Sequence, residues 1–149
     1  MSSRARVEIL HGANLEALGR RDASHYGTLG FDQLEQQISE WARELDLETR
    51  FFQTNHEGEL LDHILRIEDT ADGILINAGA WTHYSWALRD ALEVAALPTM
   101  EVHLSDIANR EDFRKVSVFE GLPTLVATIM GKGPAGYREA LIRLKEELA

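Results

Sequence analysis

The sequence contains no cysteine among its 149 residues. Thiol nucleophiles, thiolate zinc sites and disulfide frameworks are therefore excluded. No apolar run approaches the roughly 18 residues that suggest a membrane-spanning helix. The opening residues, Met1-Ser2-Ser3-Arg4, do not resemble a secretory signal peptide. We therefore expect a cytoplasmic protein that does not associate with a membrane.

Several common enzyme motifs are also missing. The chain has neither a GxxxxGKS/T nor a GxGxxG element, and Gly131-Lys132-Gly133 is too short to count as either. The absence of GxSxG argues against a serine hydrolase. The net charge of −10 argues against nucleic acid as a partner, because contacts with phosphates dominate that affinity. A small anionic substrate is not excluded, since it responds to local charge.

Lysine is scarce, with three lysines against twelve arginines. Arginine suits the bidentate recognition of carboxylates and phosphates, although genomic codon bias explains the excess equally well. The length suits one domain over residues 1–149, which buries roughly 70% of its extended-chain surface without a disulfide or metal.

Strand-like runs alternate with helix-like runs along the chain. This alternation predicts an α/β fold, a doubly wound parallel sheet of five strands with the flavodoxin-like order 2-1-3-4-5. Thr82 is the expected N-cap of the third helix, and Pro134 suits the first position of the last one. The expected strands are 7–10, 48–52, 73–77, 99–103 and 125–130, and the expected helices are 31–45, 57–67, 83–95 and one from 134, with a helical turn around 110–114.

The carboxyl ends of the strands should carry the site, as in other doubly wound sheets. The first of these connections, 12–27, is long for a small domain and holds Asn14, Arg21 and Tyr26. Nearby positive charge favours a phenolate, so Tyr26 beside Arg21 is a candidate general base, and Asn14 could hold a developing negative charge. Alternatively, Tyr26 only packs over the loop and the arginine is solvated.

The segment after the third strand contains Asn77 and His83. Free N–H groups at the start of the following helix would form an anion site, to which both side chains would add hydrogen bonds. Alternatively, Thr82 simply caps the helix and His83 is a surface residue of its first turn.

Glu101 and His103 are two residues apart on the fourth strand, so their side chains point to the same face. A carboxylate beside an imidazole orients it and favours its protonated form, which suits a general acid. The alternative is an ion pair at an exposed edge. No histidine spacing supports zinc, so we expect no metal. Arg110 and Arg114 are four apart on the expected turn, where they clamp a substrate or face the solvent.

These residues lie in blocks that resemble those of type II 3-dehydroquinate dehydratases, the dehydroquinases that need no cofactor. The blocks cover nearly the whole chain in the right order, which is far more specific than any single motif. They are GANLEALGRR (12–21), YG (26–27), QTNHEGEL (53–60), INAGAWTH (76–83), ALRDA (87–91), EVHLS (101–105) and REDFR (110–114).

The resemblance implies a hydro-lyase that removes water from 3-dehydroquinate by trans-elimination, through an enolate, to give 3-dehydroshikimate. It implies that Tyr26 is the base and that Arg21 favours its ionised form. Asn14 would position a water that stabilises the enolate oxygen. His103 would protonate the leaving hydroxyl, with Glu101 orienting it.

The resemblance also implies the substrate contacts. Asn77 and the backbone around Leu104 and Ser105 would hold the carboxylate, while His83 and Arg114 would bind the ring hydroxyls.

The remaining implications concern a lid and an assembly. Arg110 would belong to a mobile lid with the first loop and exclude water during turnover. The family's fold is flavodoxin-like, and its usual assembly is a homododecamer of trimers in which Asp90 reaches a neighbour's site.

The chain departs from the family at several positions. Ala13 and Ala23 stand where prolines are typical, so we expect a more flexible first loop and an altered catalytic rate. Asp106 stands where asparagine is common, and VFEG (118–121) replaces a more usual Tyr-Leu-Ser-Pro. Because none of these removes a residue assigned to chemistry, the reaction class is unaffected.

Three functions remain open. The first is a dehydroquinase, in shikimate biosynthesis or in quinate breakdown. The second is a dehydroquinase-like protein that binds a cyclic polyol carboxylate with little or no turnover. The third is a flavodoxin-fold binding or signalling domain, which the missing acidic cluster and hydroxyl-rich phosphate loop disfavour.

Overall fold

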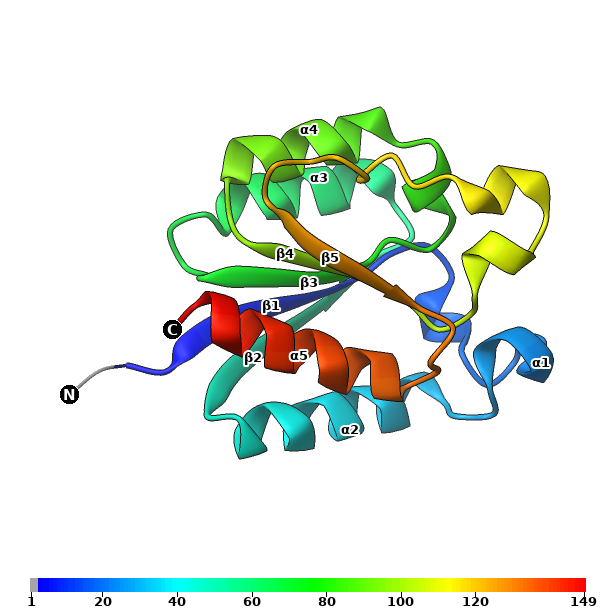
Figure 1. Cartoon of the computed structure of the whole chain (residues 1–149), viewed down its shortest axis with the longest axis horizontal. Helices are drawn as coiled ribbons and strands as arrows, with labels where there is room; N and C mark the ends of the chain where they lie inside the picture. Colours follow the sequence, from blue (N-terminus) through cyan, green and yellow to red (C-terminus); the bar gives the residue numbers. More distant parts are fainter. Residues whose placement is uncertain (1–2) are drawn as a thin grey trace.

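A computed structural model describes residues 3–149 of the chain (Figure 1). Met1 and Ser2, which entered the argument against a signal peptide, lie outside the described residues. Within residues 3–149, no helix is both long and apolar enough to cross a membrane.

A parallel sheet of five strands forms the centre of the molecule, in the order β2-β1-β3-β4-β5. The predicted fold class and strand order are therefore confirmed. The strands are β1 (Ala5–His11), β2 (Leu47–Gln53), β3 (Gly73–Asn77), β4 (Thr99–His103) and β5 (Leu125–Met130). All residues of β3 are buried, as its continuous apolar run predicts for a strand covered on both faces.

Helices cover both faces of the sheet, with α3 (Glu57–Arg66) and α4 (Trp86–Ala95) on one face, and α2 (Phe31–Glu44) and α5 (Ala135–Glu147) on the other (Figure 1). Each helix turns an apolar stripe inward, for example Leu34 and Ile38 of α2, which are fully buried. The helices on each face pack over a separate apolar cluster. The sheet between them is consequently a rigid support for the loops at its carboxyl edge.

Four 3-10 helices and the short helix α1 (Ala23–Tyr26) lie in the connections. They show that the long first connection is structured, with Asp22 capping α1 by accepting from the N–H of Ser24 at 2.9 Å. The 3-10 helices are η1 (Leu15–Ala17), η2 (Gly79–His83), η3 (Ile107–Asn109) and η4 (Asp112–Lys115).

Two sequence predictions about helices were wrong. The helix predicted to begin at His83 is α4, which begins at Trp86. Its N-cap is Ser85, whose hydroxyl oxygen accepts from the N–H of Leu88 at 3.1 Å. Thr82 is not the cap because it lies in η2, where its hydroxyl donates to the buried carboxylate of Glu101.

The prediction that Arg110 and Arg114 share one face of a helical turn was also wrong. Arg110 has extended backbone (φ −111°, ψ −163°) and precedes η4, which contains Arg114. Pro134, expected at the first helical position, is the N-cap of α5, one residue earlier.

Candidate active site

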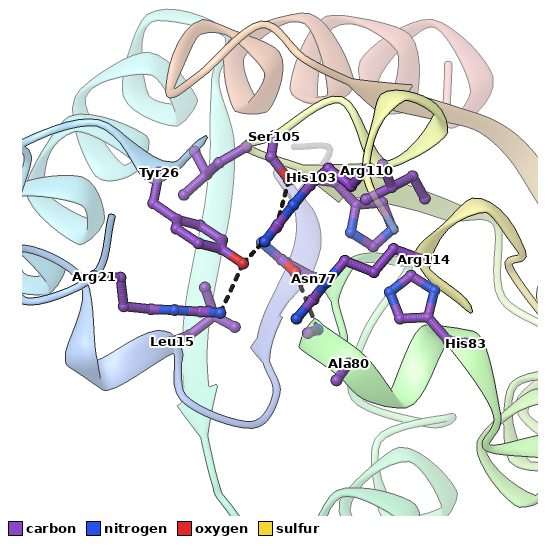
Figure 2. Close-up of a pocket in the computed structure, with 13 residues that line it drawn as sticks. Leu15, Arg21, Tyr26, Asn77, Ala80, His83, His103, Ser105, Arg110 and Arg114 are labelled. Atoms are coloured by element: carbon purple, nitrogen blue, oxygen red, sulfur yellow. Dashed lines mark hydrogen bonds between the residues drawn. The ribbon is translucent and has the colours of Figure 1, made fainter. Parts of the chain in front are cut away.

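A pocket lies at the carboxyl edge of the sheet, where the segments after β1, β3 and β4 meet (Figure 2). This is the place that the topology predicts for a doubly wound sheet. Ten of its lining residues are labelled in Figure 2, and most carry polar side chains. The lining comprises Leu15, Arg21, Tyr26, Asn77, Gly79, Ala80, His83, His103, Leu104, Ser105, Ile107, Arg110 and Arg114.

Two guanidinium groups bind the phenol oxygen of Tyr26 (Figure 2). Nη2 of Arg21 and Nη1 of Arg110 each donate to it at 2.6 Å. The guanidinium of Arg21 also lies over the tyrosine ring, 3.8 Å from its centroid. The phenol oxygen of Tyr26 thus accepts hydrogen bonds from two cationic side chains. The pairing of Tyr26 with Arg21 was predicted, but Arg110 was expected as a substrate clamp or a lid residue and not as a partner of Tyr26.

Arg110 links the first loop to the segment after β4. Besides Tyr26 it contacts Oγ of Ser105 at 3.4 Å, and its side chain is only 9% exposed. Its Nε is buried and has no hydrogen-bond partner within residues 3–149. Burying an unpaired charged donor is costly.

Glu101 and His103 form a buried pair at the end of β4. Oε2 of Glu101 lies 2.6 Å from Nε2 of His103, and the two residues are 0% and 5% exposed. Burial disfavours the charged carboxylate, but hydrogen bonds from His103, Thr82 and Ser117 outweigh it and hold the pKa of Glu101 below its usual value. The predicted same-face pairing is confirmed, and the alternative of an exposed edge pair is wrong.

Asn77 is held rigidly at the end of β3. Its Oδ1 accepts from the N–H of Gly79 at 3.1 Å, and its Nδ2 donates to the phenol oxygen of Tyr137 at 3.0 Å. Tyr137 is fully buried in α5, and burial raises the pKa of its phenol, so it stays neutral. The carbonyl of Asn77 accepts from the N–H of Gly12 at 2.8 Å, which joins the first and third loops.

Gly12 is required at this junction. A Cβ atom there would lie 2.2 Å from the carbonyl oxygen of Ala78. Only glycine therefore allows the first loop to approach the end of β3 so closely.

His83 lines the opposite side of the pocket beside Arg114 (Figure 2). Its Nδ1 lies 2.7 Å from the carbonyl oxygen of Val116, so Nδ1 carries the proton in the neutral ring. Burial lowers the pKa of His83, and the nearby positive charges act in the same direction. Neutral His83 therefore keeps Nε2 as an acceptor for a hydroxyl. Arg114 is oriented by a hydrogen bond from its Nε to Glu111.

Two predicted site residues neither line the pocket nor form a hydrogen bond with a residue that lines it. Asn14 has left-handed backbone (φ 70°), and its N–H donates to Oδ1 of Asn55 at 2.9 Å. Asp90 is exposed on α4. The other predicted residues, including Leu104 and Ser105, either line the pocket or, as with Glu101, contact a lining residue.

Sequence reasoning missed the hydroxyls that surround Glu101. Ser117 and Thr128 donate to its carboxylate, as does Thr82. One signal was available, because Thr128 is the only hydroxyl in the otherwise apolar run LVATIM of β5. A glutamate predicted inside a sheet needs such donors.

The part of the chain that the structure describes has no cluster of three or more histidine or carboxylate side chains placed to hold a metal ion. His11, for example, is fully buried between the rings of Phe31 and Phe51.

Comparison with known proteins fits this geometry. The family model described as dehydroquinase class II matches residues 5–145. The chain belongs to this family. A 3-dehydroquinate dehydratase of Syntrophotalea carbinolica is 47% identical over 138 residues, which is 92% of each chain.

Solved structures of the family agree. The type II dehydroquinase from Propionibacterium acnes has a TM-score of 0.90 at 38% identity, with 97% of this chain and 99% of that chain covered. The enzyme from Butyrivibrio crossotus gives the same TM-score at 37% identity, with the same coverage.

Proposed function

We propose that this protein is a hydro-lyase that converts 3-dehydroquinate to 3-dehydroshikimate by trans-elimination of water through an enolate. The names of its relatives and its family membership support the reaction. The observation that carries the proposal is the pocket itself, which combines a tyrosine bound by two arginines with a buried glutamate–histidine pair. Such a pair of groups supplies a base and an acid without a cofactor.

In the first step, the phenolate of Tyr26 removes a proton from the carbon beside the ketone. The C–H electron pair becomes the enolate, and the phenol holds the proton. Arg21 and Arg110 stabilise the phenolate before transfer, each through one hydrogen bond of 2.6 Å.

In the second step, the enolate collapses and the C–O bond to the leaving hydroxyl breaks. His103 donates a proton to that hydroxyl, which departs as water, and Glu101 stabilises the imidazolium before donation. Proton exchange with solvent then returns Tyr26 and His103 to their starting forms.

The substrate carboxylate would be bound by Asn77 and the backbone around Leu104 and Ser105, where hydrogen bonds fix the Asn77 amide. Nε2 of His83 and the guanidinium of Arg114 would bind the ring hydroxyls.

Asn14 would hold a water on the enolate oxygen, which requires the first loop to move because Asn14 does not line the pocket. This movement fits a lid in which the loop and Arg110 close together and exclude water. Asp90 is free on α4 to reach a neighbouring subunit. The homododecamer of trimers and the cytoplasmic location remain predictions from the resemblance and the sequence.

An absorbance assay tests the function, because 3-dehydroshikimate contains a conjugated enone that 3-dehydroquinate lacks. Purified protein mixed with 3-dehydroquinate should produce this absorbance, and the product should be confirmed by chromatography against an authentic standard. Absence of product at high enzyme concentration would contradict the proposal.

The second candidate is a protein that binds a cyclic polyol carboxylate without efficient turnover. The position of Asn14 outside the pocket favours it. Calorimetric binding of 3-dehydroquinate without product formation would establish this alternative. Family membership gives no support to the third candidate, a flavodoxin-fold signalling domain.

A further inference from the structure

The carboxylate of Glu101 is surrounded by hydroxyl groups from three different segments. Oε1 accepts from Ser117 at 2.9 Å and from Thr128 at 3.0 Å. Oε2 accepts from Thr82 and lies 2.6 Å from Nε2 of His103. A carboxylate offers about four lone-pair positions. Ser117 also lies 3.0 Å from Oε2, so Oε1 has two partners and Oε2 has three, and the carboxylate is saturated with donors.

The hydroxyl partners constrain where the protons lie. Ser117 accepts from the N–H of Phe119 at 3.2 Å and also lies 3.2 Å from the hydroxyl of Thr82. Because Thr82 donates to Glu101 as well, the Ser117 hydrogen that points to the carboxylate makes the shorter contact, at 2.9 Å. The side-chain hydroxyl of Thr128 has no other hydrogen-bond partner within residues 3–149. A protonated Glu101 would lose an acceptor position and leave a buried hydroxyl without its partner, which is unfavourable. The hydroxyls consequently favour the carboxylate, and a proton shared with His103 stays on the imidazole.

We propose that Ser117 and Thr128 are positioning residues for the proton donor, because their hydroxyls keep Glu101 ionised and so place the proton of the pair on His103 instead of on the carboxylate. The inference rests on the role of His103 in the proposed function. Ser117 follows η4, so it also connects this carboxylate to the segment that carries Arg114.

The other charged groups around Glu101 do not replace these hydroxyls. His103 is on the same strand, and His83 and Arg114 approach from η2 and η4. The neighbouring strands present uncharged partners, Ile76 of β3 and Thr128 of β5. His83 is held neutral by burial, so the hydroxyls are the immediate donors that balance the charge of Glu101.

Thr128→Val gives the cleanest test, because valine keeps the shape of threonine and removes only the hydroxyl that contacts Glu101. We expect kcat to fall and the basic limb of the kcat–pH profile to move to higher pH, because a carboxylate with fewer donors holds the proton of the pair more tightly and makes the imidazolium a weaker acid. The expected shift is about one pH unit, the scale of one hydrogen bond to a charged group. KM should change less than twofold. Ser117→Ala should shift the limb in the same direction, and Thr128→Ser should restore the profile.

Thr99→Val is the matched control. Thr99 is a buried threonine on the same strand and face as Glu101, but its hydroxyl donates to the carbonyl of Leu97 at 2.9 Å. The basic limb of the kcat–pH profile of Thr99→Val should coincide with that of the wild type. A Thr128→Val profile that coincides with Thr99→Val, or a uniform loss of kcat without movement of the limb, overturns the proposal.

A second measurement does not depend on turnover. ¹⁵N NMR of the His103 ring should show Thr128→Val losing the proton of the pair at higher pH than wild type, and identical titrations overturn the proposal. If the wild type makes no product while the NMR difference is present, the proposed function fails and the positioning role stands. If Ser117→Ala does not fold, Thr128→Val and Thr82→Val carry the test.

Discussion

Tyr26 and Arg110 are 84 positions apart in the sequence, and Nη1 of Arg110 donates to the phenol oxygen of Tyr26 at 2.6 Å. The bond joins the two segments that flank the pocket opening, the first loop and the segment after β4 (Figure 2). It places a cation from the segment after β4 directly on the candidate base.

Tyr26→Phe removes the proposed base and leaves the ring. We expect kcat to fall by at least about 10²-fold, the scale of general acid–base catalysis. The absorbance assay measures this, with Tyr84→Phe as the control because Tyr84 is 59% exposed and does not line the pocket. A near-normal rate would refute the role of Tyr26.

Arg110→Met should lower kcat roughly 10- to 100-fold at neutral pH, since a hydrogen bond to a charged group contributes about 1.5–3 kcal/mol. The absorbance assay measures the rate. Arg50→Met is the control, as Arg50 lies on β2 with a half-exposed side chain and forms an ion pair with Glu48 at 3.8 Å. An Arg110→Met rate close to that of Arg50→Met would refute the role of Arg110.

Tyr137→Phe should affect both stability and binding. It leaves the buried Nδ2 of Asn77 without its partner, which costs about 1–3 kcal/mol of the free energy of unfolding. We also expect KM to rise more than kcat falls, because Asn77 loses the bond that fixes its amide. Urea unfolding and steady-state kinetics measure the two effects, and unchanged stability with unchanged KM would contradict them.

The lowered pKa of His83 predicts a pH dependence of stability. Its unfolded-state value is 6.5, so the unfolded chain binds a proton there first. The contribution of His83 to the free energy of unfolding is therefore complete above pH 6.5. This contribution is lost as the pH falls through the pKa that His83 has in the folded state. His83→Asn retains a donor for the carbonyl of Val116 and does not titrate.

Urea unfolding of wild type and His83→Asn between pH 8 and 5 provides the measurement. The difference in unfolding free energy, wild type minus variant, should decrease below pH 6.5. Other histidines titrate in both proteins and cancel in the difference. A difference that is independent of pH would rule out the effect.

Ala23→Pro should stabilise the first loop. Ala23 is the first residue of α1, where proline is favoured, and its N–H makes no backbone hydrogen bond within residues 3–149. We expect a gain of about 0.4–1 kcal/mol through reduced freedom of the unfolded chain. Thermal unfolding measures it. Ala17→Pro is the contrast, because the N–H of Ala17 donates to the carbonyl of Asn14 at 3.0 Å, and it should destabilise.

The elements that sequence predicted best are those governed by local periodicity. The strands β3, β4 and β5 have the predicted bounds, because a short apolar run between turn residues leaves few alternatives. The predicted first residue of α4 was wrong because threonine and serine are both good N-cap residues, and the sequence offers Thr82 as well as Ser85. A tertiary contact, the bond of Thr82 to Glu101, decides between them.

The same division holds for the site. The sequence alone predicted the sheet order, and it predicted the Tyr26–Arg21 and Glu101–His103 pairings as one of two alternatives each, because strand alternation and short spacing bring these groups together. Only the tertiary structure decided that Arg110 binds Tyr26, that Asn77 is held by Tyr137, and that three hydroxyls surround Glu101. These contacts join residues from segments far apart in the chain, and their geometry depends on how the packed sheet and helices place each loop, which no local pattern records.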